Sequence, residues 1–303
     1  MTGFFGLIAG GGKVKGLNLS GTVTVTGDVS QTGGIAGAME DVEKASNITD
    51  CSFSGSVSGN IQVGGIVGCV GLHNNVERCS NTAAVTGKEL IGGIAGANSY
   101  GNIRYCRNTG TVGNDTAEQV GGIVGAHQNY AELIASYNTG EVKGADYIGG
   151  IAGNVYVASM PLGCYNVGSV SSGMHCGGAV GSFGGDDYIT IKNGSFYQGP
   201  LPEAYKANGA KMKTAEEMKK DSFVSALNAE AYVTCYTKDT HNKNNGYPIL
   251  TWEVDGFQVT FDANGGDCDI TNVNVAVNGS LNELPTPYRW NYKFDGWFTE
   301  KDG

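Results

Sequence analysis

The chain has 303 residues, 50 of them glycine, and its 19 Lys and Arg against 29 Asp and Glu give a formal net charge of −10. This acidic balance, with no run of basic residues, argues against nucleic acid and anionic membranes as partners. No apolar run reaches the roughly 18 residues that a spanning helix needs, so no membrane-spanning segment is expected in this stretch. The first residues lack a basic segment and an apolar signal core, so an export signal is expected outside it.

Residues before about 200 carry a repeated glycine motif. A glycine doublet, then Ile (once Ala), then Ala or Val, then Gly, recurs six times at intervals of 28 to 31 residues. A degenerate copy at residues 6–10 precedes the series. The doublets begin at Gly33, Gly64, Gly92, Gly121, Gly149 and Gly177. Fixed recurrence of glycine in a chain that is 40% hydrophobic indicates a repetitive fold and not a linker.

Between the doublets lies a second motif, which reads Cys79-Ser-Asn-Thr-Ala-Ala-Val85 in one repeat. Its side chains are expected to alternate between two faces, as in a β-strand. A unit of this length with short strands cannot bury its own apolar face, so each unit is expected to stack on the next, with strands about 4.8 Å apart. Stacking predicts a buried ladder of Cys51, Cys79, Cys106 and Cys164, with Ser136 as a polar substitute, and an amide ladder of Asn81, Asn108, Asn138 and Asn166 that Phe53 breaks. Insertions at residues 38–49 and 154–162 are expected to be loops.

The chain changes character after residue 199. Thr214 and Glu217 have the spacing of a capping box, and apolar residues at helical spacing follow, so a helix is predicted over residues 215–229. The open end of a stack of strands needs covering. Residues 200–255 are therefore expected to form a small mixed α/β cap.

The repeated Gly-Gly-Ile-(Ala/Val)-Gly core and the Asn-Thr-Gly-x-Val segment that follows it resemble the GLUG repeat over residues 5–199. This repeat occurs in bacterial surface proteins, including some adhesins and some immunoglobulin-A-cleaving metallopeptidases. The resemblance implies an exported, extracellular protein of the bacterial cell surface. It also implies an all-β fold, a β-solenoid of about seven coils built as a right-handed parallel β-helix. It implies no activity, because the repeat is an accessory unit.

Residues 257–303 resemble the Listeria–Bacteroides repeat, also called the internalin B-type repeat, through the strings at 259–266, 284–287 and 292–298. The resemblance implies a β-grasp-like module whose last strands are missing here. The chain is therefore expected to continue past Gly303 into further repeats and an anchor. The predicted division is a solenoid at 1–199, a cap at 200–255 and a partial module at 256–303.

The sequence offers little support for a metal site or for a reactive cysteine or histidine. No Cys-x-x-Cys pair occurs, and the ladder cysteines are expected to be free and buried, like small apolar residues. Cysteines outside the ladder (Cys69, Cys176, Cys235 and Cys268) leave another pairing open. No His-Glu-x-x-His string exists, so a zinc peptidase is not expected. The histidines (His73, His127, His175 and His241) are expected on the surface or in loops. No cofactor and no metal are expected.

A few acidic and tyrosine residues are candidates for a sugar- or peptide-binding face, because tyrosine joins apolar area to a hydrogen-bonding tip. They are Tyr130 beside Glu132, Asp146 beside Tyr147, and the Asp186, Asp187 and Tyr188 cluster. The alternatives are that these tyrosines stack between coils, and that Asp186 and Asp187 form a turn or a weak calcium site.

Three functions stay open at this point. The first is a non-catalytic surface protein, either an adhesin or a rigid stalk that presents binding modules, with a host or neighbouring-cell surface protein or glycan as its partner. The second is a carbohydrate- or glycoprotein-binding module that uses solenoid loops. The third is a polysaccharide-cleaving β-helix enzyme, which would need carboxylates clustered beside a basic group. The sequence shows no such set, so no enzymatic activity is expected.

Overall fold

The computed structural model describes residues 1–27, 30–40, 43–156, 159–171, 173–184, 194–199, 210–254, 256–276 and 284–298. Its compact units are Met1–Pro248 and Ile249–Gly303. The first unit contains the repeats and most of residues 200–255, the segment expected to cap them. The three-part division with boundaries after residues 199 and 255 stays a prediction.

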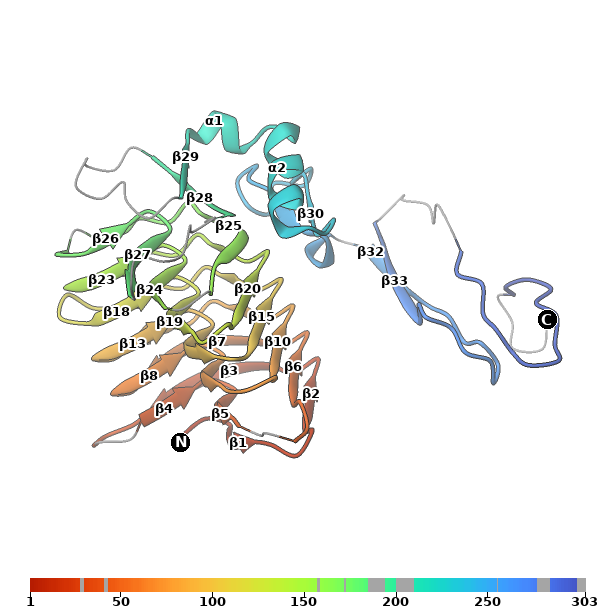
Figure 1. Ribbon diagram of the computed structural model, residues 1–303, viewed down its shortest axis with the longest axis horizontal. Coiled ribbons are helices and arrows are strands. Elements are labelled where there is room, and N and C mark those ends of the chain that lie inside the picture. The colour runs from red at the N-terminus through yellow and green to blue at the C-terminus, as the bar shows by residue number, and fades with distance from the viewer. Residues whose placement is uncertain are drawn as a thin grey trace. The chain divides into compact units, whose positions relative to one another are not determined.

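Short parallel strands wind through the first unit and form three sheets, as Figure 1 shows. Sheet A holds β4 (Ser30–Gly33), β8 (Ile61–Gly64), β13 (Glu89–Gly92), β18 (Glu118–Gly121), β23 (Asp146–Gly149) and β26 (Cys176–Gly177). Sheet B holds β1 (Phe5–Ile8), β5 (Ala36–Met39), β9 (Val67–Val70), β14 (Ala95–Ser99), β19 (Val124–Gln128), β24 (Ala152–Tyr156) and β27 (Val180–Gly184).

Sheet C holds the remaining strands of the coils in two rows that meet at β25. The first row is β2 (Lys13–Lys15), β6 (Asn47–Thr49), β10 (Asn75–Glu77), β15 (Asn102–Arg104), β20 (Glu132–Ile134) and β25 (Pro161–Asn166). The second is β3 (Asn18–Thr24), β7 (Ser52–Ser58), β11 (Ser80–Asn81), β12 (Ala84–Thr86), β16 (Arg107–Asn108), β17 (Val112–Gly113), β21 (Tyr137–Asn138) and β22 (Val142–Lys143). Two strands, β28 (Gly194–Gln198) and β29 (Lys211–Lys213), extend the sheet beyond β25.

Each repeat makes one coil that runs through sheet A, sheet B and both rows of sheet C in turn. Sheet B has seven strands and sheet A has six, so the chain completes about six turns. The predicted all-β solenoid is therefore confirmed. The predicted loops at 38–49 and 154–162 are wrong at their ends, because β5, β6, β24 and β25 reach into them. Sheet register outweighs the sequence irregularity there, since each strand gains hydrogen bonds from its neighbour.

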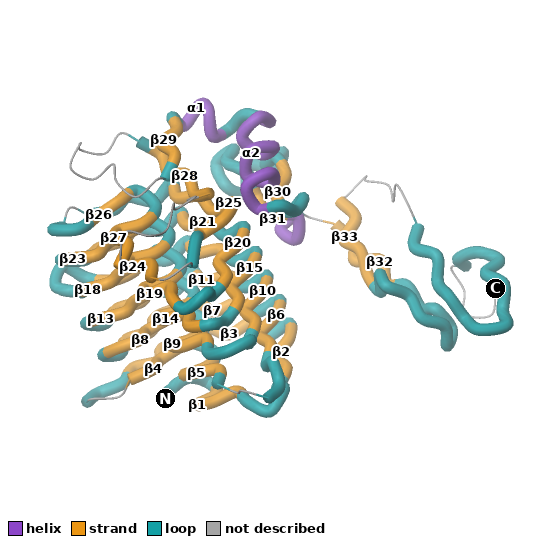
Figure 2. Tube along the Cα trace, in the orientation of Figure 1, coloured by secondary structure: helices purple, strands orange, loops and turns teal. Residues whose placement is uncertain are grey.

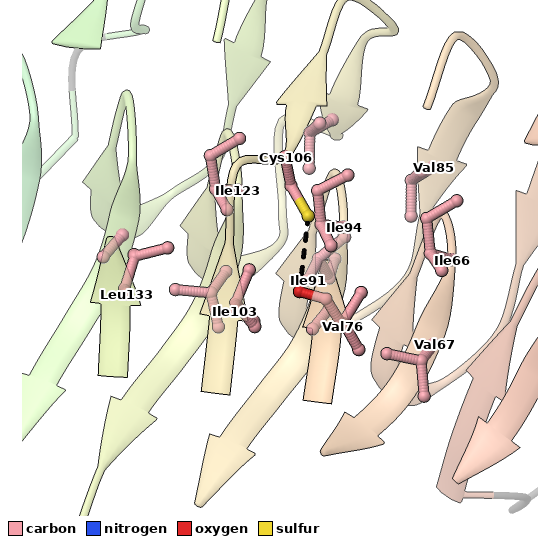
Figure 3. Packing of buried hydrophobic residues seen from close by; sticks show 14 of the residues in the cluster. Ile66, Val67, Val76, Val85, Ile91, Ile94, Ile103, Cys106, Ile123 and Leu133 are labelled. Carbon is pink, nitrogen blue, oxygen red and sulfur yellow. Dashed lines mark hydrogen bonds between the residues drawn. The ribbon is translucent and has the colours of Figure 1, made fainter. Parts of the chain in front are cut away.

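The interior of the coils is a set of aligned apolar columns. Ile66, Ile94 and Ile123 are fully buried and occupy equivalent corners of successive coils, as Figure 3 shows. Val76 pairs with Ile103 in the adjacent column. Burying a side chain of this size contributes about 1.5–3 kcal/mol. Because every coil repeats these positions, the core is continuous along the stack.

The glycine doublet leaves the space that the asparagine column fills. A Cβ atom on Gly93 would lie 2.2 Å from the Gly122 carbonyl oxygen and 2.4 Å from Asn108 Cγ. Real Cβ atoms do not come this close to backbone, so only glycine fits. The glycine doublet and the asparagine motif therefore keep a fixed spacing, because the doublet leaves the space that the asparagine side chain fills.

Helices and short strands follow the last coil, and they are purple and orange in Figure 2. They are α1 (Ala215–Met218), α2 (Asp221–Ala231) and β30 (Tyr236–Thr237). The capping box of Thr214 and Glu217 is confirmed. The single helix predicted over 215–229 is wrong, because the chain is extended at Lys220. Met218 and Phe223 are both buried, and five residues apart they would lie on nearly opposite sides of one continuous helix.

An aromatic cluster fixes α2 to the end of the solenoid. The rings of Tyr137 and Tyr165 stack at 5.0 Å, and Phe223 of α2 meets Tyr165 edge-on at 5.9 Å. Tyr165 Oη accepts a hydrogen bond from Asn244 Nδ2 at 2.8 Å. Such ring pairs add about 0.5–1.5 kcal/mol each beyond the area they bury. The helix is thus part of the first compact unit.

The second unit contains β31 (Ile249–Leu250), a 3₁₀ turn at Thr251–Glu253, β32 (Gly256–Thr260) and β33 (Asn272–Ala276). Strands β32 and β33 pair in antiparallel fashion. The Trp297 ring packs 4.9 Å from that of Phe261. A β-grasp-like arrangement of the whole module stays a prediction. Across the ranges described in both units, no helix is long and apolar enough to cross a membrane.

Candidate functional site

The predicted asparagine residues form a hydrogen-bonded column inside the coils. Asn81, Asn108 and Asn138 each donate from Nδ2 to the Oδ1 atom of the next asparagine at 2.8 Å. The last acceptor is Asn166, whose own Nδ2 donates to the Gly178 carbonyl at 3.0 Å. Each Oδ1 also accepts from the backbone N–H two residues further on. All four side chains are buried, so this column holds coils together and offers nothing to a ligand.

The predicted cysteine column is buried as well. The Sγ atoms of Cys79, Cys106 and Cys164 donate to carbonyls of the preceding coil at 3.6 to 3.9 Å. Ser136 takes the cysteine position in its own coil, and its Oγ accepts from the backbone N–H of Cys106 at 3.1 Å. Cys51 at the first position is also buried. Burial raises the pKa of the Cys164 thiol to about 12. All eight cysteines lie in described ranges and are free. A thiol that burial keeps protonated, as at Cys164, is a poor nucleophile and a poor metal ligand.

No metal centre emerges from the part of the chain that the structure describes, where no three His, Cys, Asp or Glu side chains come together in a way that could hold an ion. The predicted cluster of Asp186, Asp187 and Tyr188 lies outside the described residues. The remaining candidates are Tyr130, Asp146 and Tyr147.

A narrow seam runs along the solenoid where sheets A and B meet. Each sheet A strand from β4 to β23 places one non-glycine residue in the left-handed region: Gln31, Gln62, Leu90, Gln119 and Tyr147, with φ between 53° and 71°. Opposite them, successive strands of sheet B carry a row of aligned residues, namely Ala38, Cys69, Ala97, Ala126 and Asn154. A Cβ atom on Gly153 would lie 2.7 Å from the Gln119 carbonyl carbon, so glycine permits this close approach.

Side chains from the two sheets meet across the seam. Gln31 Nε2 donates to Glu40 Oε1 at 3.0 Å in the first coil. Three coils further on, Tyr156 Oη donates to Gln119 Oε1 at 3.5 Å, and Gln119 Nε2 donates to Glu89 Oε1 at 2.9 Å. The seam is therefore lined by polar side chains above a row of small buried residues.

Polar and aromatic groups gather toward the C-terminal coils of the seam. We call Gln119, Asp146, Tyr147, Asn154, Tyr156 and His175 the seam cluster. Asp146 Oδ1 accepts from the backbone N–H groups of Tyr147 and His175, both at 2.9 Å, and lies 2.8 Å from His175 Nδ1. The Tyr147 and His175 rings stack at 4.8 Å with an interplanar angle of 6°. Asp146 thus orients an aromatic pair whose histidine is about half exposed, at 47%.

Asn154 lies at the floor of the seam cluster and is 3% exposed. Its Nδ2 donates to Tyr156 Oη at 2.6 Å. Its Oδ1 is buried and finds no hydrogen-bond partner among the residues described. Burial, with Tyr147 acting in the same direction, raises the pKa of Tyr156, so its hydroxyl stays protonated. An orphaned buried carbonyl costs about 1–3 kcal/mol of stability.

Tyr130 belongs to a different surface, which we call the aromatic corner and define as Tyr100 and Tyr130. These side chains are 47% and 68% exposed in the turns that lead from sheet B to sheet C. Beside them, Arg104 Nε donates to Glu132 Oε2 at 3.0 Å. Within the described residues, no contact joins Tyr130 to Asp146 or Tyr147. The structure therefore brings Asp146 and Tyr147 together and leaves Tyr130 apart from them.

One histidine departs from expectation. His127 is fully buried, so the surface or loop position expected for it is wrong. It pairs in register with Asn98 and Val155, in a column that faces the core. Its Nδ1 lies 3.4 Å from Asn98 Nδ2, and its Nε2 has no partner among described residues. Burial lowers the pKa of His127 to about 3, so the ring is neutral.

Sequence reasoning missed Asn154, Tyr156, His175 and Gln119 as members of one cluster. The row of Asn154 holds small residues in the other coils, namely Ala38, Cys69, Ala97, Ala126 and Ser182. A larger polar residue in a row of small ones was the signal available.

Comparisons with known proteins identify both repeat types in this chain. A family model for the GLUG motif matches residues 87–113, which span one complete coil from the turn after β12 to the end of β17. A model for the Listeria–Bacteroides repeat domain matches residues 257–303. Both resemblances noted in the sequence are confirmed. No curated protein matches the chain.

A solved structure shares the architecture. The crystal structure of a candidate immunoglobulin A1 protease from Bacteroides ovatus is similar to this chain with 22% sequence identity and a TM-score of 0.51. The likeness covers 82% of this chain and 70% of that one. At this identity it shows the fold alone, and the name belongs to that protein.

Proposed function

We propose that this chain, with its GLUG motif and Listeria–Bacteroides repeat, is a non-catalytic protein of the bacterial cell surface that acts as an adhesin or as a rigid stalk presenting binding modules. The observation that carries the proposal is the combination of two surface-type repeats in one chain, one of them built into a solenoid. Its partner is a surface protein or glycan of a host or neighbouring cell.

The construction of the solenoid supports a mechanical role. Coils are linked by backbone hydrogen bonds in three sheets and by the asparagine column, so neighbouring units are fixed in one register. Stacked repeats of this kind hold extended surfaces and place modules at a distance.

Two experiments test the surface role. Antibodies against the 303-residue protein should label intact cells, and brief protease treatment of those cells should remove the label. The purified protein on beads should bind host matrix proteins or glycans in a saturable manner if it is an adhesin. Label found only after cell lysis would contradict the proposal.

The absence of catalysis is tested separately. The protein incubated with immunoglobulin A1 or with polysaccharides is expected to leave both uncut, as judged by gel electrophoresis and by assay of reducing ends. New fragments or reducing ends that disappear in a heat-treated control would overturn the non-catalytic assignment.

A carbohydrate- or glycoprotein-binding module is the second candidate. The seam cluster favours it, because the Tyr147 and His175 rings and the Asp146 carboxylate come together there on the solenoid. Protein sites for sugars combine such aromatic area with a few placed polar groups.

A further inference from the structure

We propose that two copies of this chain dimerise by pairing their β3 strands in antiparallel fashion across a two-fold axis at Gly21. The interaction surface is the free edge of β3 at the N-terminal end of the solenoid (Figure 1). The dimer goes beyond the proposed function, because it does not depend on whether the chain is an adhesin or a stalk.

Strand β3 has one paired edge and one free edge. It has seven residues and pairs with β7 alone, and within the described residues no strand lies beyond it. The Ser52 N–H donates to the Leu17 carbonyl, and the Val25 N–H donates to the Ser58 carbonyl, both at 2.9 Å. Because the backbone groups of a strand alternate between its two edges, the odd-numbered residues of β3 bond to β7. The residues whose backbone groups face the free edge are Asn18, Ser20, Thr22 and Thr24.

This edge lacks the features that keep a free strand from pairing. Natural edge strands are very short, or they carry charged residues, proline or a bulge. Residues 16–27 contain no charged residue and no proline. Strand β2, at the same end of the stack, has three residues and carries Lys13 and Lys15, which protect its edge. The longer β3 is therefore the strand that is open to a partner.

The sequence of β3 is self-complementary about Gly21. In an antiparallel pair centred there, Leu19 of one copy faces Val23 of the other. Both side chains are half-buried and pack on the hydrophobic core, so pairing would cover their remaining surface. The polar pairs are Asn18 with Thr24 and Ser20 with Thr22. These even-numbered residues take the hydrogen-bonded positions, and Gly21 takes a non-hydrogen-bonded position, where the two chains come closest.

The N-terminal coil does not carry the amide column that joins the later coils. Leu19 pairs with Phe53, and Phe53 pairs with Asn81, so the column stops before it reaches the free edge. A further coil of the same kind would find no amide there on which to continue the column. A second copy that meets β3 with its own β3 needs none.

The opposite end of sheet C is already covered. Strands β28 and β29 extend the sheet past β25, and Phe223 of α2 packs on Tyr165. Head-to-tail stacking through sheet C is therefore blocked, whereas two N-terminal ends can meet. Such an isologous contact closes at two copies.

A pair of charge variants tests the register. Ser20→Lys/Thr22→Lys places like charges opposite each other across the two-fold axis, and Ser20→Glu/Thr22→Glu does the same with the other sign. Each variant alone should dimerise about tenfold more weakly than the parent, or weaker still. An equimolar mixture of the two should recover the dimer, because every lysine then faces a glutamate. Both side chains are exposed, so the melting temperature should stay within a few degrees of the parent's.

The matched control is Ser54→Lys/Ser56→Lys in β7. These residues are in register with Ser20 and Thr22 but lie one coil further from the free edge. The control adds the same charge to the same face, and it should dimerise like the parent.

Sedimentation velocity of the full 303-residue protein over a concentration series measures the dimer. The parent should shift from monomer to dimer as its concentration rises. Hydrogen exchange in β3, which is fast in the dilute monomer, should slow at the even-numbered residues as the dimer forms.

A disulfide locates the axis. Gly21→Cys treated with oxidised glutathione should give a covalent dimer, because the Cα atoms of a non-hydrogen-bonded antiparallel pair lie about 4.5 Å apart, within the range that a disulfide spans. Gly21→Ala is the control without the added thiol, and it should give none.

Several outcomes would overturn the dimer. One is a parent that stays monomeric at the highest concentration it tolerates, and another is a dimer that both charge variants keep. A mixture that fails to recover the dimer, or a control weakened as much as the β3 variants, would contradict the register. A monomer that instead binds an extended peptide along β3 would assign the edge to a different partner. Labelling of intact cells reports on the proposed function and is independent of all these results.

Discussion

At the scale of single residues, amides decide how the coils are joined. Asn108 makes four hydrogen bonds: its Oδ1 accepts from Asn81 Nδ2 and Gly110 N, and its Nδ2 donates to Asn138 Oδ1 and the Gly110 carbonyl. Asn102 makes a comparable amide contact to Asn75 at 2.8 Å, but on a half-buried face where water can replace it.

Asn108→Ala should lower the free energy of unfolding by about 1–3 kcal/mol, because buried partners lose their hydrogen bonds. Asn102→Ala should change it by less than about 0.5 kcal/mol. Urea denaturation followed by circular dichroism measures both. Equal effects of the two substitutions would contradict the assigned difference in burial.

His127 should make stability depend on pH. The folded protein keeps the ring neutral with a pKa of about 3, whereas the unfolded chain binds a proton near pH 6.5. The unfolded state therefore holds more protons below pH 6.5, and stability falls as pH drops toward 3. Between pH 7 and pH 5 this group alone should cost about 2 kcal/mol.

His127→Met provides the control for that pH effect, since Met39 fills the equivalent position of the first coil. Subtracting the variant's unfolding free energy from the parent's at each pH isolates the histidine from the carboxylates. A difference that stays constant from pH 7 to pH 5 would show that His127 binds its proton as readily in the folded protein as in the unfolded chain.

The residues that sequence reasoning could place are those that repeat. The asparagine and cysteine positions recur with the period of the coil, so their alignment follows from stacking alone. Gln119 and Tyr156 are 37 residues apart and differ in phase, and they meet only because sheets A and B pack together. Nothing in the repeat reports that contact, so the seam cluster could not be assembled from the sequence.

At the scale of elements, glycine positions control how the strands approach. Gly93→Ala should destabilise the protein by more than about 3 kcal/mol, because the new Cβ would overlap the Gly122 carbonyl oxygen and the Asn108 amide. Gly21→Ala in β3 is the matched control, since no atom would lie within 4 Å of its new methyl group. Thermal unfolding of the two variants tests this. Similar melting temperatures would contradict the close approach at the doublet.

The helical segment shows what limits prediction at this scale. The capping box predicts where α1 begins, because it depends only on four adjacent residues. The break before α2 could not be predicted, because it lets both Met218 and Phe223 be buried, and Phe223 packs on Tyr165 at the end of the solenoid. Tertiary packing here outweighs helical spacing.

At the scale of the first unit as a whole, the protection of backbone amides from hydrogen exchange should vary along the stack of coils. Strand β3 at the N-terminal end is largely exposed, whereas β14 and β19 have paired strands on both sides and buried side chains. Hydrogen-exchange mass spectrometry should find the slowest amides in β14 and β19 and the fastest in β2 and β3. Uniform protection from β2 to β24 would show instead that the stack opens only as one cooperative unit.

The direction of the inter-coil hydrogen bonds has a consequence for a protein under load. These bonds run along the axis of the stack, so tension applied to its two ends would open one coil at a time, as in a zipper. Each released unit of about 28 residues could extend to roughly 95 Å. In the surface role proposed above, a cell held in flowing liquid through this chain would lengthen it stepwise and dissipate the pull before the attachment gave way.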